Sequence, residues 1–218
     1  MSGFVIAVDG PAASGKGTVS AMLGRTYGFP VLDTGLLYRA VGHAVLARGG
    51  DLDDETAAAV VASALSPTEL EDPALRTREA GEAASRVAVH AGVRQALLAF
   101  QRAFAARAPG AVLDGRDIGT VIAPDAPAKL FVTASSEARA HRRWLQLTAS
   151  EPGVTLEAVL ADIRLRDERD SGRAAAPLVQ AADAVLLDTS EMTIDQAADA
   201  ARRIIEAARA RWEQSQQG

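Results

Sequence analysis

The sequence contains no cysteine, only three histidines and few aromatic residues. Without cysteine the chain can form neither disulfides nor a thiolate nucleophile, which fits a reducing compartment. His43, His90 and His141 are far apart and show no metal-ligand spacing. Aromatic residues make up 4% and the net charge is −5, so there is neither a stacking set nor an overall basic character to favour nucleic acid.

Long hydrophobic runs are also missing. None approaches the roughly 20 apolar residues that a membrane span needs, and no basic N-terminal stretch precedes an apolar one as in a secretory signal. We therefore expect a cytoplasmic protein with neither a membrane nor a nucleic acid as partner. We also expect a monomer.

What the sequence does contain is a regular alternation of short apolar runs and longer helical segments. Strands are predicted at residues 4–8, 29–32, 111–113, 129–133 and 184–187. Helices are predicted at residues 15–27, 35–47, 53–65, 77–89, 93–106, 136–149, 156–170 and 193–212. This pattern predicts an α/β protein with a doubly wound sheet of about five parallel strands and helices on both faces.

A glycine-rich loop joins the first strand to the first helix. It consists of Gly10, Pro11, Ala12, Ala13, Ser14, Gly15, Lys16, Gly17 and Thr18. Such a loop cradles phosphate through converging backbone N–H groups at a helix N-terminus. Lys16 can reach the β- and γ-phosphates of ATP and Thr18 can offer a hydroxyl to Mg²⁺. The alternative is a strand-to-helix turn that is merely rich in glycine.

The lysine is followed by Gly17 and then Thr18, whereas the strict P-loop pattern has Ser or Thr directly after lysine. The order Gly-Lys-Gly-Thr is typical of nucleotide kinases similar to adenylate kinase. The loop predicts a nucleotide site but does not by itself specify a reaction.

Acidic residues follow two of the predicted strands. Asp114 ends a buried strand, where strand ends form the ligand crevice of a parallel sheet. It is a candidate for holding Mg²⁺ through water, and the alternative is a turn or N-cap aspartate. Asp33, at the end of the second predicted strand, has the same alternative.

Two further groups combine arginine with aspartate. Arg166, Asp170 and Arg173 are spaced to share one face of a helix, although such a run is usually a solvated surface. Asp117 and Arg94 together provide an acceptor and a donor, as a site that reads the edge of a base needs. The alternative for these two is an Arg–Asp ion pair.

Two neighbouring arginines, Arg142 and Arg143, lie within the helix predicted after the fourth strand. They could face phosphates, and a solvated helix surface is the equal alternative.

Four segments together resemble the bacterial cytidylate kinases. They are residues 10–18, residues 32–39 (LDTGLLYR), residues 113–120 (LDGRDIGT) and residues 163–178. The resemblance covers residue 5 to about residue 189, and the segment DGRDIGT is quite specific to that family.

The resemblance implies transfer of the γ-phosphoryl group of ATP to CMP or dCMP with Mg²⁺, in pyrimidine nucleotide metabolism. It implies a cytosine site at Ser85, Arg94 and Asp117. Thr34, Arg39 and Arg116 would hold the monophosphate and its sugar. Arg166, Asp170 and Arg173 would contact ribose and phosphates as a lid closes. The catalytic residues would be Lys16, Arg116, Arg166 and Arg173.

The same resemblance implies one nucleoside monophosphate kinase domain over residues 1–218. Its core would span about 4–65 and 94–212, and an arginine-rich lid about 150–175. Related bacterial enzymes usually carry a small β-rich insert over the monophosphate. Here the corresponding region, about 66–76, is much shortened and leaves no room for a sheet.

Three other functions are open at this point. The chain could phosphorylate UMP, another nucleotide or a metabolite alcohol; it could be a P-loop NTPase of the switch or motor type; or it could bind RNA. Arg116 beside Asp114 favours an anionic acceptor over a motor, in which paired acidic residues would be expected. The scarcity of aromatic residues disfavours RNA binding.

Overall fold

The computed structural model describes residues 3–149, 151 and 153–216, and its centre is a parallel sheet of five strands. The strands are β1 (Phe4–Asp9), β2 (Val31–Asp33), β3 (Gly110–Gly115), β4 (Ala128–Thr133) and β5 (Val185–Asp188). Their order is β2-β3-β1-β4-β5 and every pairing is parallel. From β1 the chain passes to the edge strand β2 and returns to β3, which lies between them; it then crosses to β4 and β5 on the other side of β1. This order confirms the predicted doubly wound α/β fold.

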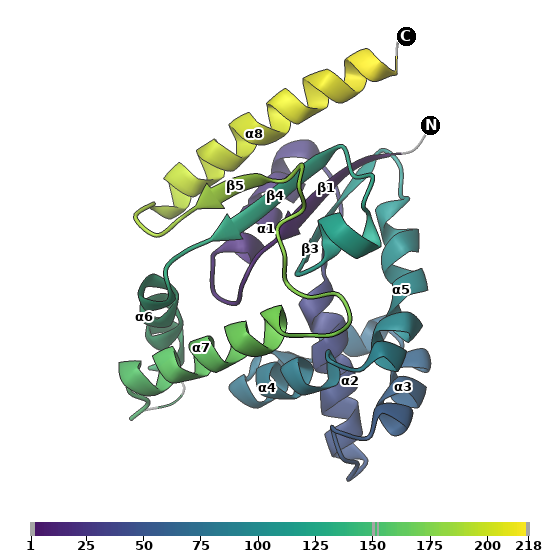
Figure 1. The fold of residues 1–218 in the computed structure, drawn as a ribbon, viewed down its shortest axis with the longest axis vertical. Coiled ribbons are helices and arrows are strands. Elements are labelled where there is room, and N and C mark those ends of the chain that lie inside the picture. Colours follow the sequence, from purple (N-terminus) through teal and green to yellow (C-terminus); the bar gives the residue numbers. More distant parts are fainter. Residues whose placement is uncertain (1–2, 150, 152, 217–218) are drawn as a thin grey trace.

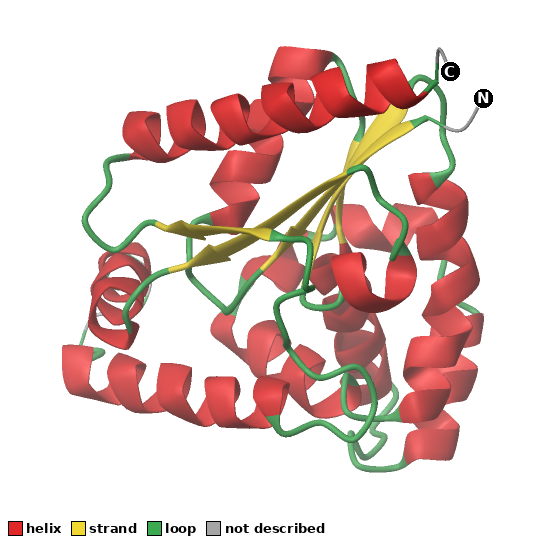
Figure 2. Ribbon diagram, turned by 45° about the horizontal axis from the view of Figure 1, so that its top comes forward, coloured by secondary structure: helices red, strands yellow, loops and turns green. Residues whose placement is uncertain are grey.

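Helices cover both faces of the sheet (Figure 2). Their bounds are α1 (Lys16–Tyr27), α2 (Thr34–Ala47), α3 (Glu55–Ser63), α4 (Arg78–Val87), α5 (Ala91–Ala105), α6 (Ser136–Leu147), α7 (Leu156–Ser171) and α8 (Ile194–Ser215). Ile6 and Val8 of β1 pack with α1 and α8, while Ala7 packs on the opposite face with α5. Both faces of β1 are therefore buried, which is why it reads as a continuous apolar run.

The second strand begins later than predicted, at Val31. Gly28 ends α1 in a left-handed conformation (φ 68°), and the N–H of Phe29 returns to the carbonyl of Gly24 at 2.9 Å. The Phe29 ring is buried beside Phe4. Gly28 and Phe29 thus close the end of the helix, and the apolar character of Phe29 reflects core packing rather than strand pairing.

Two short 3₁₀-helices, η1 (Pro67–Glu71) and η2 (Pro73–Arg76), fill the region predicted to replace the insert. Ser66 and Asp72 cap them, each accepting a hydrogen bond from a backbone N–H two residues on. No strand lies between residues 66 and 76, so the absence of a sheet there agrees with the sequence. The sequence had indicated only chain breaks at the two prolines, because so short a helix leaves no periodic pattern.

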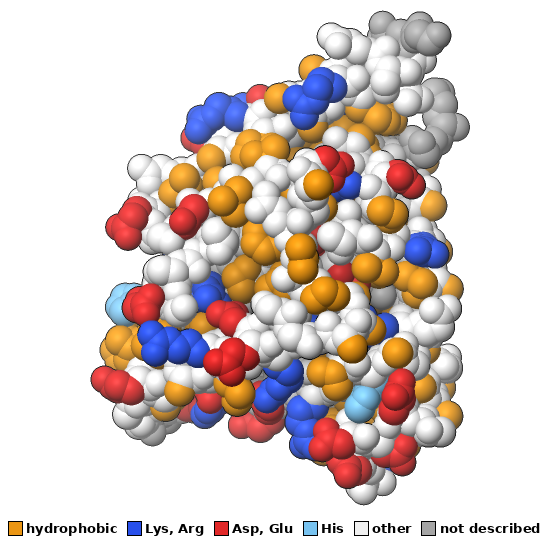
Figure 3. All heavy atoms as spheres, in the orientation of Figure 1, with side chains coloured by type: hydrophobic (Ala, Val, Ile, Leu, Met, Phe, Trp, Pro, Cys, Tyr) orange, Lys and Arg blue, Asp and Glu red, His pale blue; other side chains and the backbone are white. Residues whose placement is uncertain are grey.

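The carboxyl ends of the strands point towards a space bounded by α2, α4, α6 and α7 (Figure 1). Helix α7 lies within the predicted lid, of which Ser150 and Pro152 lie outside the described residues. On the face drawn in Figure 3, acidic and basic side chains are interspersed over α7 and α4. Within the described part of the chain, no helix is long and apolar enough to span a membrane.

Candidate active site

The glycine-rich loop at the end of β1 has a backbone that only small residues fit. Gly10 has φ 149°, and a Cβ there would lie 2.0 Å from the carbonyl oxygen of Val132. Gly15 has φ 90° and forms the N-cap of α1 without a side-chain hydrogen bond from any described residue. The first amides of α1 are therefore left to bind an anion, as expected for a phosphate loop.

Lys16 is the first residue of α1 and bends back over the loop. Its Nζ donates to the carbonyl of Pro11 at 3.1 Å and lies 3.9 Å from Oδ1 of Asp114 at the end of β3. Burial lowers the pKa of Lys16 and raises that of Asp114. A Cβ at Gly17 would lie 3.3 Å from Oδ2 of Asp114, which gives a steric reason for glycine directly after the lysine.

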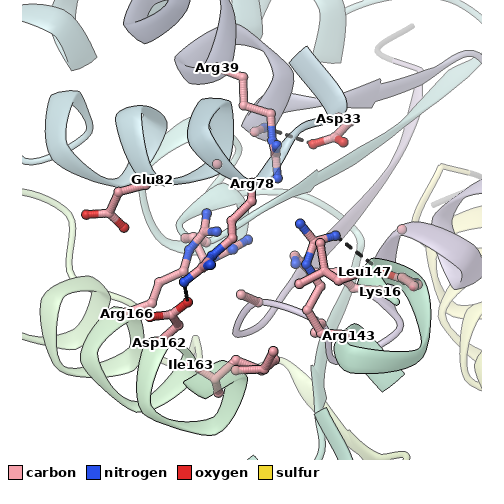
Figure 4. Close-up of a pocket in the computed structure, with 18 of the residues that line it drawn as sticks. Lys16, Asp33, Arg39, Arg78, Glu82, Arg143, Leu147, Asp162, Ile163 and Arg166 are labelled. Carbon is pink, nitrogen blue, oxygen red and sulfur yellow. Dashed lines mark hydrogen bonds and ion pairs between the residues drawn. The ribbon is translucent and has the colours of Figure 1, made fainter. Parts of the chain in front are cut away.

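A central cavity of about 430 Å³ opens beside Lys16. Figure 4 shows side chains from α1, α2, α6 and α7 extending towards this space. Among the predicted site residues, its lining includes Ala12, Ala13, Lys16, Gly17, Arg39, Asp114, Arg116 and Arg166. The structure thus brings the glycine-rich loop, the end of β3 and Arg166 of the predicted lid to one place.

An outer cavity of about 460 Å³ lies on the other side of the loop. It is lined by Gly15 and Thr18 from the predicted set, and by Arg142, Thr189 and Ile194 from the C-terminal half. Ala13, Lys16 and Gly17 line both the outer and the central cavity. The remaining residues of the loop, Gly10, Pro11 and Ser14, are buried.

A third, small cavity of about 40 Å³ adjoins the central one. Its lining contains eight of the nine residues predicted to bind the monophosphate: Thr34, Ser85, Arg94, Arg116, Asp117, Arg166, Asp170 and Arg173. The ninth, Arg39, lines the central cavity and donates to the carbonyls of Leu75 and Thr77. A space of this size holds little more than one or two waters.

Asp170 of α7 is the hub of the small cavity. Its Oδ2 accepts from Nε of Arg116 at 2.9 Å, its Oδ1 pairs with Arg173, and Nε of Arg166 lies 4.0 Å away. Burial alone would raise the pKa of Asp170, but the three arginines together hold it far below its usual range. Arg166 has a pKa lowered to about 10 by burial and by Arg116, so it stays charged at neutral pH.

The polar groups predicted to hold the monophosphate already have partners within the protein. Arg94 forms a buried ion pair with Asp117, and its guanidinium lies 5.6 Å from the ring centroid of Tyr38. Ser85 accepts a hydrogen bond from Arg169 at 2.9 Å. Thr34 donates to the backbone carbonyl of Asp114 at 2.8 Å. The ion-pair alternative for Arg94 and Asp117 is therefore present in this structure.

Comparison with known proteins decides the family. A sequence model of the cytidylate kinase family, described as "Cytidylate kinase", matches residues 6–207. The chain belongs to the cytidylate kinase family. It is 69% identical over 209 residues to the cytidylate kinase of Caulobacter sp. (strain K31), covering 96% of this chain and 97% of that protein. It is 64% identical over 207 residues to the cytidylate kinase of Xanthobacter autotrophicus (strain ATCC BAA-1158 / Py2), covering 95% and 99%.

A solved structure supports the fold alone. An uncharacterized protein from Eubacterium ventriosum ATCC 27560 superposes with a TM-score of 0.53 at 14% identity, covering 94% of this chain and 98% of that one.

In this member of the cytidylate kinase family, one acidic residue that sequence reasoning missed anchors the segment DGRDIGT. Asp9, at the end of β1, accepts hydrogen bonds from the N–H groups of Ile118 at 2.8 Å and Gly119 at 2.7 Å. These residues begin η3 (Ile118–Ile122), a single π-helical turn that was also not predicted. Asp9 ends a buried strand just as Asp114 does, and that shared pattern could have identified it.

Asp9 predicts an unusual pH dependence of stability. Burial raises the pKa of Asp9 to about 6. The contribution of Asp9 to the unfolding free energy is therefore fully present below about pH 4 and is lost as the pH rises through about 6. We expect the unfolding free energy of wild type, relative to Asp9→Asn, to fall by up to about 3 kcal/mol between about pH 4 and pH 7. Urea unfolding across this range measures it, and a constant difference between the two proteins would contradict the assignment.

Arg139 was likewise not predicted, although it ties the loop to α7. It is buried, donates to the carbonyl of Ala12 at 3.3 Å and forms a bidentate pair with Asp167 at 3.0 and 2.6 Å. Asp167 is the neighbour of Arg166, so this pair sets where Arg166 lies relative to the loop. Nothing in the sequence distinguishes it from the other charged residues of these helices.

The donors present fit a magnesium ion held mainly by nucleotide phosphates. No group of three or more His, Asp or Glu able to hold a metal occurs among the described residues. Magnesium in phosphoryl-transfer sites typically uses one or two carboxylates, several waters and the substrate phosphates. Asp114, buried beside Gly17, supplies a carboxylate at the loop, and Thr18 supplies an exposed hydroxyl at the start of α1.

Proposed function

We propose that this chain transfers the γ-phosphoryl group of ATP to CMP or dCMP, producing ADP and CDP or dCDP. The observation that carries the proposal is the central cavity, where the phosphate loop of a cytidylate kinase family member meets the arginines around Asp170. A donor on the loop and an acceptor in the small cavity would bring their phosphates together there.

ATP is assigned to the loop of residues 10–18, with the outer cavity beside it for the nucleoside. Lys16 would contact the β- and γ-phosphates, supported by its place at the start of α1 between the two larger cavities. Thr18 would offer its hydroxyl to Mg²⁺ and Asp114 would hold the ion through water, and the ion would neutralise charge on the phosphates.

The monophosphate is assigned to the small cavity and the adjoining part of the central one. Thr34, Arg39 and Arg116 would hold phosphate and sugar. Ser85, Arg94 and Asp117 would face cytosine, and Arg166, Asp170 and Arg173 would reach ribose and phosphates. The support is that eight of these nine already line one cavity.

Entry of a base requires the small cavity to widen, since about 40 Å³ is too small for a pyrimidine ring. Its walls come from α2, α4, α5 and α7 and from the end of β3. Surface ion pairs between α4 and α7 join Arg78 to Asp162 and Arg169 to Glu82. Such exposed pairs are weak and allow the two helices to separate.

The reaction itself needs positioning and positive charge rather than a strong base. Lys16, Arg116, Arg166 and Arg173 would stabilise the transferring phosphoryl group between the two nucleotides. Arginine suits this role because its planar fork binds phosphate oxygens in pairs and stays charged. The Asp170 hub would hold the arginine side chains in place before the substrates arrive.

Several further properties remain predictions from the sequence. They are a single kinase domain over residues 1–218 with a lid at about 150–175, a monomeric state, a cytoplasmic location, and no membrane or nucleic acid partner.

The proposal is tested by ADP formation from Mg-ATP with CMP, dCMP, UMP, AMP and GMP, and with no acceptor. We expect fast turnover confined to CMP and dCMP, because Asp117 matches the amino group that uracil lacks. Fast turnover with a different acceptor would keep a kinase but overturn the assignment of Ser85, Arg94 and Asp117.

A further inference from the structure

Arg142 and Arg143 are consecutive on α6 but serve different cavities. Nη1 of Arg142 donates to Oγ1 of Thr189 at 3.0 Å, and the residue lines the outer cavity. Arg143 lines the central cavity together with Lys16 and Arg166. Neighbouring residues on an α-helix point about 100° apart, so α6 can supply an arginine to each space. Figure 4 shows Arg143 extending from α6 into the central cavity.

Arg143 differs from the paired arginines around it. Arg116 pairs with Asp170, and Arg78 pairs with Asp162. For Arg143, no carboxylate oxygen of a described residue lies within 4.0 Å, and its hydrogen bond to Oε1 of Gln146 is long, at 3.4 Å. A guanidinium carries five N–H donors, so most of this hydrogen-bonding capacity is unused.

Holding this charge in the cavity is unfavourable without an anion. The partial burial of Arg143 lowers its pKa; the negative charge of Glu151 acts in the opposite direction, and the positive charge of Arg78 lowers the pKa again. The positive charge of Arg116 also lowers the pKa of Lys16 and of Arg166, which line the same cavity. Cations gathered in this way repel one another, and a polyanion bound among them would replace this repulsion with attraction.

We infer that Arg143 is a further phosphate-binding residue, which reaches from α6 to contact the phosphate chain in the central cavity. The inference builds on the proposed function, because it takes the central cavity as the place where donor and acceptor phosphates meet. Gln146 positions the guanidinium while the cavity is open. The fork of Arg143 then binds phosphate oxygens, adding to the charge supplied by Lys16 and Arg166.

The test compares Arg143→Met with Arg143→Lys, and uses Arg164→Met as the matched control. Arg164 lies on α7, is exposed and pairs with Glu137 at 3.0 Å, away from the three cavities. We expect Arg143→Met to lower kcat/KM for CMP about 100-fold, Arg143→Lys to recover part of the loss, and Arg164→Met to match wild type. Thermal unfolding checks that each variant is folded.

A second readout separates this inference from the identity of the acceptor. Inorganic tripolyphosphate binding is measured by calorimetry in wild type, Arg143→Met and Arg164→Met. We expect about tenfold weaker binding in Arg143→Met only. If Arg143→Met binds tripolyphosphate more weakly but wild type does not turn over CMP, the proposed function is wrong and the inference about Arg143 still holds. Unchanged tripolyphosphate binding in folded Arg143→Met would overturn the inference, even if turnover fell, because the residue would then act through packing.

Discussion

Replacing Lys16 by methionine is expected to lower kcat with CMP by about 1000-fold while the protein stays folded. The ammonium group lies where the glycine-rich loop, Asp114 and both larger cavities meet. Methionine keeps the length and the apolar stem but removes the charge that the transferring phosphoryl group needs. Burial already raises the pKa of Asp114, so this carboxyl can take up a proton when its partner is lost.

The chain offers a matched control, because Lys129 is its only other lysine. Lys129 is also buried, and it pairs with Asp183 at 2.7 Å. Lys129→Met should cost stability but leave kcat within about twofold of wild type, since it lines none of the three cavities. Steady-state assays and urea unfolding of both variants separate the two effects. Equal losses of turnover in both would mean that Lys16 acts through stability.

Replacing Asp170 by asparagine is expected to reduce both stability and kcat/KM for CMP. The carboxylate is almost fully buried and faces Arg116, Arg173 and Arg166. Removing one member of a buried charge network leaves the others uncompensated, which costs about 3–5 kcal/mol of unfolding free energy. The three arginines also lose their common anchor, so we expect kcat/KM to fall about 100-fold. Urea unfolding and initial rates at varied CMP measure the two losses.

The pH dependence distinguishes this charge effect from a packing effect. Because the folded-state pKa of Asp170 is depressed, its stabilisation is present above the unfolded pKa and disappears as the pH falls. The stability difference between wild type and Asp170→Asn should therefore shrink progressively below about pH 4. Asp199→Asn is the control, since Asp199 is exposed on α8 and lies 3.5 Å from Arg202. A difference that persists unchanged into acid would assign the effect to shape rather than charge.

Most of the fold was predictable because the buried strands are short, apolar and separated by strong helix patterns. The hydrophobic pattern predicted the five strands, and the glycine pattern predicted the loop whose backbone needs those glycines. The start of β2 was misplaced because Phe29 is buried for packing rather than pairing. The turn η3 was missed because its anchor, Asp9, is 109 positions away in sequence from Ile118.

Most of the residues predicted for the site line the three cavities, but the pairings among them were not predictable. Motif positions and family resemblance brought together the residues that line the small cavity. That Asp170 would join Arg116 rather than only its helix neighbours depends on tertiary distances that no local spacing encodes. The same holds for Arg139, whose partners Ala12 and Asp167 come from the loop and from α7. The sequence does not show which way Arg142 and Arg143 point; in the structure, Arg142 lines the outer cavity and Arg143 the central one.

The most direct test of the central claim follows the γ-phosphoryl group itself. ATP labelled at the γ-phosphate is incubated with Mg²⁺ and CMP, and the label is located after a single turnover. The structure and the family predict that the label appears in CDP, and that little inorganic phosphate forms with or without CMP. Label released as inorganic phosphate at the same rate in the presence and absence of CMP would contradict the account and make the chain a nucleotide hydrolase.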